Sequence, residues 1–226
     1  IHVNHGESDK VSMVSNQAKA YDRVFVAGEA AVRRHRAALA DFDADLLAIQ
    51  TRWADANYSP KGDAREAAFD KLMADAAAFT ARNPGRAEPL IWEGIVLSTT
   101  AGVKGGLGAL GLAKDSKAKL EAALKIDPKA LQGSAYTSLG TLYHKVPGFP
   151  VGFGSDKKAK EYLEKSLAIN PDGIDPNYFY GELLFDDDDY AGAKKHLEKA
   201  LQAPPRPSRQ SADEGRRKEI RVLLAK

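Results

Sequence analysis

The sequence predicts an all-α solenoid of antiparallel helix pairs, because apolar residues recur at helical spacing and small residues stand at fixed distances from prolines. The clearest unit covers residues 177–205. In it, Gly181 is followed by Ala193, then by Leu197, and Pro205 lies 24 residues after the glycine. Small residues let two helices cross closely, and proline ends the second helix. This stretch therefore predicts two antiparallel helices.

The same spacing continues on both sides of this unit. Pro171 precedes Gly181 by ten residues, and Pro205 precedes Gly215 by ten. A unit of 24 residues with a ten-residue join gives a period of 34 residues, which is the period of the tetratricopeptide repeat (TPR). The predicted fold is therefore a TPR-like antiparallel helix-pair solenoid or bundle.

Two earlier units keep this pattern but contain apolar insertions. Gly140 lies 31 residues before Pro171, seven more than expected, and Gly94 lies 34 residues before Pro128, ten more. The extra residues fall between the two helices of each unit, at 101–112 and 146–154. Insertions at one place in successive repeats project from one face, so we expect two apolar loops on the same edge of the solenoid.

The remaining elements follow from periodicity and turn signals. Residues 1–8 are expected to form a loose terminus, and residues 9–58, which include Phe25, to form two helices or one long helix bent near Gly28. Asp63 is a predicted N-cap, and Ser155 or Asp156 another. We expect residues 9–84 to pack on a stack of TPR-like repeats over 85–226, all in one domain. The further helices are predicted over 64–82, 87–101, 114–126, 130–145, 157–169 and 212–226, the last as a cap.

Composition excludes several classes of function. The net charge is +2, with 33 basic and 31 acidic residues, so no uncompensated basic surface for nucleic acid is predicted. The absence of cysteine excludes disulfides, thiolate metal sites and cysteine nucleophiles. No apolar run is long enough to cross a membrane. Because the chain begins with Ile1 rather than Met, an upstream segment such as a secretory signal is expected to have been removed or left out.

No catalytic, metal or cofactor site is predicted. Gly106, Gly108 and Gly111 match GxGxxG, but no strand-like segment precedes them, so a dinucleotide site is rejected. The aspartates at 186–189 are adjacent rather than alternating, which favours a solvated loop over a calcium site. The histidines form no metal-binding motif, although His2 and His5 could bind a metal adventitiously.

The insertions carry the functional hypothesis. Both are apolar, whereas ordinary surface loops are polar, so they are expected to pack on each other and the core, to enclose a hydrophobic cavity, or to meet another protein. The helix over 87–101 is apolar nearly all round, which predicts burial on more than one side. The expected cavity wall consists of Trp92, Val96, Thr100, Leu107, Leu110, Tyr136, Tyr143, Phe149, Phe153, Tyr178, Phe179 and Leu183. Glu182, beside Tyr178, is either a ligand contact or a satisfied surface residue.

The stretch VPGFPVGFGSDKKAKEYLEKSLAINPDGIDPNYFYGELL, with HLEKALQAPPRP and a closing helix, resembles bacterial cell-envelope TPR proteins related to the T component of tripartite ATP-independent periplasmic (TRAP) transporters. It is also similar to the helical-bundle component of bacterial sterol transport. The resemblance covers roughly residues 85–226. It implies a periplasmic or outer-membrane-associated protein with a hydrophobic cavity, working beside another envelope transport protein.

These observations predict a non-catalytic binding or transport protein that holds a sterol or another lipid. Enclosure by apolar walls contributes about 25 cal/mol per Å² of buried apolar area, so useful affinity would need no charge pairing. The alternative is a protein–protein adaptor in a cell-envelope transport complex, in which the concave groove holds a partner's helix or tail.

Overall fold

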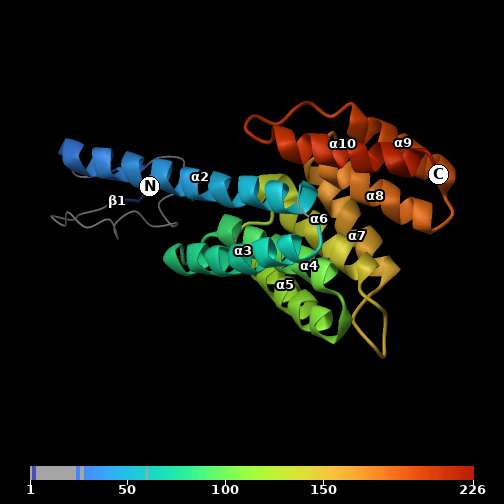
Figure 1. The fold of residues 1–226 in the computed structure, drawn as a ribbon. Coiled ribbons are helices and arrows are strands. Elements are labelled where there is room, and N and C mark those ends of the chain that lie inside the picture. The colour runs from blue at the N-terminus through green and yellow to red at the C-terminus, as the bar shows by residue number, and fades with distance from the viewer. Residues whose placement is uncertain (1, 4–23, 26–27, 60) are drawn as a thin grey trace.

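The computed structural model describes residues 2–3, 24–25, 28–59 and 61–226, and these are almost entirely helical (Figure 1). In order, the described helices are α2 (Gly28–Tyr58), α3 (Asp63–Arg82), α4 (Ala87–Lys104), α5 (Gly106–Ile126), α6 (Ala130–Lys145), α7 (Asp156–Ile169), α8 (Ile174–Asp186), α9 (Tyr190–Leu201) and α10 (Gln210–Leu224). A short parallel pairing joins β1 (His2–Val3) to β2 (Val24–Phe25). No helix in these ranges is long and apolar enough to cross a membrane.

Successive helices pack as pairs, which confirms the predicted solenoid. The pairs are α2 with α3, α4 with α5, α6 with α7, and α8 with α9. The first helices of neighbouring pairs also touch, since α4 contacts α6 and α6 contacts α8. Helix α10 packs on α8 and α9, where the first helix of a further pair would lie.

Glycines stand where the helices of a pair cross. A Cβ atom added to Gly94 would lie 2.7 Å from Leu120 Cγ, and one added to Gly140 would lie 2.5 Å from Leu163 Cγ. The same atom at Gly181 would lie 2.9 Å from Leu197 Cγ. Since real Cβ contacts are longer than this, each crossing requires a residue without a side chain. The repeat register predicted from the sequence therefore has a steric cause.

The register extends to Gly215 of α10, and its neighbour comes from the other end of the helical array. A Cβ atom at Gly215 would lie 2.5 Å from the ring of Tyr58, at the end of α2. Helix α2 contacts α10 as well as α3 and α4, so the first and last described helices pack on each other (Figure 1). The array closes on itself across the side lined by the first helices.

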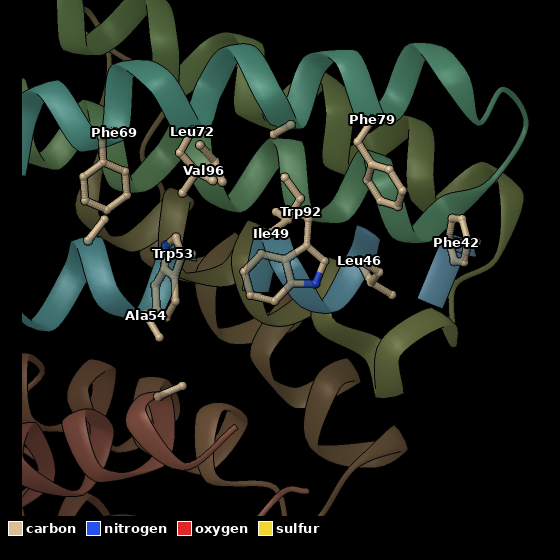
Figure 2. Close-up of a cluster of buried hydrophobic side chains, with 13 residues drawn as sticks. Phe42, Leu46, Ile49, Trp53, Ala54, Phe69, Leu72, Phe79, Trp92 and Val96 are labelled. Atoms are coloured by element: carbon tan, nitrogen blue, oxygen red, sulfur yellow. The ribbon is translucent and has the colours of Figure 1, made fainter. Parts of the chain in front are cut away.

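The core consists of three clusters. The first lies between α2, α3 and α4, and its aromatic rings are in contact: Phe42 stacks on Phe79 at 5.3 Å, and Trp53 meets Trp92 edge to face at 5.9 Å (Figure 2). The second joins α4 to α8 around Leu120, Leu139 and Leu163. The third joins α8, α9 and α10.

The prediction that the first insertion, residues 101–112, forms a loop is wrong. Helix α4 continues to Lys104 and α5 begins at Gly106, so residues 101–112 lie almost wholly in helices. Only Gly105 and Gly106, both with positive φ, form the reversal. Leucine and alanine favour helix between the other glycines, and Ser116 in α5 donates a 2.7 Å hydrogen bond to the Gly94 carbonyl oxygen, which fixes α5 against α4. The second insertion, residues 146–154, forms a loop as predicted and projects from the body between α6 and α7 (Figure 1).

Three local features of the helices differ in how they compare with the predictions. Helix α3 starts at Asp63, and the N-cap Gly62 supplies no side-chain hydrogen bond, so Asp63 is not the cap. Residues 131–133 have positive φ, which interrupts the helix predicted over 130–145 and lets Leu131 pack against both the first and the second core cluster. Ser155 caps α7 as predicted, accepting a hydrogen bond from the Lys158 backbone N–H.

The N-terminal predictions are covered only in part. His2–Val3 pairs as a strand where a loose terminus over 1–8 was expected, and Phe25 lies in β2 rather than in a helix, because valine and phenylalanine suit the pleated backbone. Residues 1, 4–23, 26–27 and 60 lie outside the described part of the chain. The division into 9–84 and 85–226 stays a prediction.

Candidate binding groove

The residues predicted to line one cavity are distributed over several packed clusters. Trp92 and Val96 belong to the first cluster, Tyr143 and Leu183 to the second, and Tyr178 to the third. Thr100 is fully buried and donates a hydrogen bond to the Val96 carbonyl oxygen at 2.7 Å. The half-buried members are Leu110, Tyr136, Phe153 and Phe179. Phe149 is exposed, and the side chain of Leu107 lies outside the described part of the chain.

Arginine side chains from the C-terminal segment cover several of these rings. The Arg209 guanidinium lies 5.1 Å from the ring of Trp92. The Arg216 guanidinium lies 4.5 Å from the rings of both Tyr178 and Phe179. Cations over aromatic faces are attracted to them, so three of the positions expected to meet a ligand are in contact with the protein's own arginines.

A charge network holds Arg216 in place together with Arg206, whereas Arg209 forms no ion pair with any described residue. Asp175 in α8 lies 2.6 Å from Arg206 Nη1 and 2.9 Å from Arg216 Nε. Arg206 also pairs with Asp213 at 2.6 Å, and Arg216 with Glu219 at 2.7 Å. Burial alone would raise the pKa of Asp175, but the two guanidinium groups outweigh it and hold that pKa well below its usual range. The network fixes α10 against α8.

An open groove of about 300 Å³ remains between α8 and α10. Its lining residues are Tyr178, Glu182, Lys218, Glu219, Val222, Leu223 and Lys226. Val222 exposes 57% of its surface, although α10 is otherwise a polar helix. The groove therefore combines an apolar surface with a charged rim.

The charges of the rim are not equivalent. Glu182 lies 3.1 Å from Lys145 Nζ, and Glu219 is paired with Arg216. Among the described residues, no ion pair is formed by Lys218 or Lys226. Lys218 and Lys226 are therefore the charged groups available to a bound molecule. Burial, followed by the negative charge of Glu182, raises the pKa of Tyr178, so its phenol is neutral.

Sequence reasoning found one side of this groove. Tyr178 was predicted as a wall residue and Glu182 was named beside it, both on α8. The α10 side was missed because the helix over 212–226 was interpreted only as a cap. Lys218 and Val222 stand four residues apart, on one helix face, and that spacing is the signal that could have indicated them.

The rings of His144 and His196 form hydrogen bonds with side chains of other helices, so both histidines have structural roles. His144 Nε2 lies 2.9 Å from Asp186 Oδ2, which joins α6 to the end of α8. His196 Nδ1 lies 3.0 Å from Asn177 Oδ1, and burial lowers the pKa of His196. In the described ranges, no group of three or more His, Cys, Asp or Glu side chains could hold a metal ion.

The helix pairs with glycine crossings define a TPR-like α-solenoid. In the comparisons, the chain is similar to the crystal structure of TTC0263, a thermophilic TPR protein from Thermus thermophilus, with a TM-score of 0.54 and 16% sequence identity. The match covers 84% of this chain and 93% of that chain. Neither a family model nor a curated protein sequence matches the chain. At this identity the likeness shows the fold alone.

Proposed function

We propose that this protein is a non-catalytic adaptor that binds a segment of a partner protein in the groove between α8 and α10. The observation that carries the proposal is the open groove itself, in which exposed Val222 lies next to unpaired Lys218 and Lys226. The first helices of TPR-like pairs offer such surfaces to extended or helical segments.

The lining residues suggest the chemistry of that segment. Tyr178, Val222 and Leu223 suit an apolar side chain, while Lys218 and Lys226 suit carboxylates on either side of it. Glu182 and Glu219 already have cationic partners and would repel additional acidic groups less than free carboxylates would. We therefore expect a short acidic segment with a central apolar residue.

The test is photo-crosslinking in cells of the source organism, with a photoreactive amino acid placed at Val222. The expected result is one crosslinked protein that disappears when Lys218→Glu is added, because charge reversal repels an acidic segment. The matched control places the same probe at Ile126, an exposed apolar residue at the end of α5. Equal crosslinking from both positions, or a product unaffected by Lys218→Glu, would overturn the proposal.

The lipid-carrier hypothesis stays a prediction. A sterol among Trp92, Tyr178 and Phe179 would have to displace Arg209 and Arg216 from these rings. A periplasmic location and the relationship to TRAP T components likewise rest on the sequence resemblance. Native mass spectrometry of the protein from its own cells separates the two functions, since a carrier retains a lipid mass and an adaptor a protein mass.

A further inference from the structure

The loop over residues 146–154, here called the finger, ends in an apolar tip that the described protein leaves uncovered. Phe149 exposes 93% of its surface and Val151 exposes 67%. Pro147 and Pro150 are exposed as well. An aromatic side chain stabilises a protein or a complex when it is buried. The exposed tip is therefore suited to burial in a binding partner or surface outside the chain.

The base of the finger is held by backbone hydrogen bonds. The Gly154 N–H donates to the Pro147 carbonyl oxygen at 2.9 Å, and the Gly152 N–H donates to the Gly148 carbonyl oxygen at 3.0 Å. The Ser155 N–H donates to the Tyr143 carbonyl oxygen at 2.8 Å, which ties the end of the finger to α6. These bonds form a closed base below the exposed tip.

One aromatic residue of the finger points back into the protein. The ring of Phe153 meets Tyr143 edge to face at 5.5 Å, and Tyr143 stacks on Tyr162 at 5.5 Å. A Cβ atom at Gly152 would contact Pro147 and would lie 3.4 Å from Leu110 Cδ1 of α5. The two predicted insertions therefore meet at the base of the finger. Phe153 anchors the loop, whereas Phe149 remains free.

Basic residues follow the finger directly. Lys157 and Lys158 lie in the first turn of α7 and Lys160 one residue beyond it, and all three are exposed. Of the nearby acids, Glu161 pairs with Lys165 at 2.8 Å, and exposed Asp156 lies 3.5 Å from His144 Nδ1 without a hydrogen bond to it. Lys158 lies 5.1 Å from the Tyr143 ring, and no ion pair is formed by Lys157 or Lys160 within the described ranges.

We propose that the finger attaches the protein to an anionic lipid surface, with Phe149 and Val151 inserted among the acyl chains and Lys157 and Lys160 near the headgroups. An exposed apolar tip on a loop whose base is followed by cations without ion pairs matches the two attractions that hold a protein at a membrane interface, apolar burial and attraction to anionic lipid. A protein partner would instead need a pocket for the tip. The inference does not rest on the groove between α8 and α10.

The test is co-sedimentation of the full chain with phosphatidylcholine vesicles, with and without phosphatidylglycerol. We expect wild type to bind the anionic vesicles, and Phe149→Ser to weaken that binding by about tenfold or more, because one inserted aromatic side chain is lost. Lys157→Gln should weaken binding to anionic vesicles by about fivefold and reduce its dependence on salt.

Two further variants make the result decisive. Ile126→Ser removes an apolar residue that is 45% exposed but distant in sequence from the finger, and should leave vesicle binding unchanged. Phe149→Trp should give a blue-shifted emission with anionic vesicles, and quenching by brominated acyl chains. Absence of wild-type binding, binding that survives Phe149→Ser, or a Phe149-dependent protein complex without vesicle binding would each overturn the inference. Substitutions in the groove should leave vesicle binding intact, so failure of the membrane inference can be distinguished from failure of the adaptor proposal.

Discussion

Replacing a crossing glycine by alanine tests the cause of the helix-pair register. We expect Gly140→Ala to destabilise the protein most, because the new Cβ would lie 2.5 Å from Leu163 Cγ and 3.1 Å from the Ala159 carbonyl oxygen. Leu163 is fully buried, so its side chain has little room to move. Gly181→Ala should cost least of the three crossings, since its nearest contact is 2.9 Å.

The magnitude follows from two opposed effects. Overpacking of a tight core costs about 1–3 kcal/mol, and alanine recovers up to about 1 kcal/mol of helix propensity relative to glycine. The expected net loss at Gly140 is therefore about 1–2 kcal/mol in the free energy of unfolding. Urea denaturation followed by far-UV circular dichroism measures it from the midpoint at constant slope.

The chain contains a matched control for this experiment. Gly108 and Gly111 lie inside α5, and a Cβ at either position would meet nothing within 4 Å. Gly108→Ala should therefore stabilise the protein by about 0.5–1 kcal/mol, as expected for an exposed helical site. Because a loop would give no such gain, this variant also tests the helical structure of residues 106–112.

A double substitution completes the argument. Leu163→Ala removes the two Leu163 atoms that the new Cβ at Gly140 would meet and leaves only the longer contact with the Ala159 carbonyl oxygen, so Gly140→Ala should cost less in that background than in wild type. If Gly140→Ala and Gly108→Ala changed stability by the same amount and in the same direction, close approach would not be the reason for glycine at the crossing.

Four further substitutions probe the C-terminal network, the finger and the groove. Asp175→Asn should lower the free energy of unfolding by about 3 kcal/mol at neutral pH in urea denaturation, since two guanidinium groups lose their shared carboxylate. Because the pKa of Asp175 is depressed, its contribution to the free energy of unfolding is present above the unfolded-state pKa of about 3.9 and is lost as the pH falls below it. Asp175→Asn should therefore also flatten the acid side of the plot of stability against pH. An unchanged acid side would contradict this. Phe153→Ala should lower the melting temperature because the contact with Tyr143 is lost, while Phe149→Ala should leave it unchanged, and equal effects in a thermal scan would contradict the division into anchor and tip. Val222→Ser should change stability by no more than about 0.5 kcal/mol, and a larger loss in the same scan would show that Val222 is a core residue rather than a groove surface.

The repeat register could be predicted because it depends on contacts within one helix pair. Gly181 and Leu197 lie close in the sequence, and the steric requirement at their crossing recurs at Gly140 and Gly94. Ser155 could likewise be predicted as a cap, since capping involves only neighbouring residues. Features determined within one unit are therefore visible in the sequence.

The packing of α2 on α10 could not be predicted in this way. Gly215 continues the repeat pattern, but nothing near it in the sequence indicates that its neighbour is Tyr58. The same holds for Arg209 over Trp92, which brings the residue before α10 against α4. The sequence indicated apolar positions, but Arg209 and Arg216, which cover some of them, lie just before and within a helix interpreted as a cap.

The first insertion shows a different limit. Glycines at 102, 105, 106, 108 and 111 were interpreted as a loop, although only Gly105 and Gly106 form the turn. A glycine shows that a left-handed or closely packed backbone is sterically allowed at its position, but not that the chain adopts it. Leucine and alanine between these glycines, together with the hydrogen bond from Ser116 to Gly94, decide the outcome in favour of helix.

The position of α10 connects the interior and the surface of this solenoid. Its Arg216 lies over the rings of Tyr178 and Phe179 and pairs with Asp175, so this part of the closed side is filled by a cation that has its own counter-charge. An apolar ligand in that interior would have to leave that cation without its aromatic and carboxylate partners, which is costly in a buried site. Binding at the outer features, the groove beside Val222 and the tip at Phe149, requires no such loss. Electrostatics therefore favours recognition on the outside of the stack.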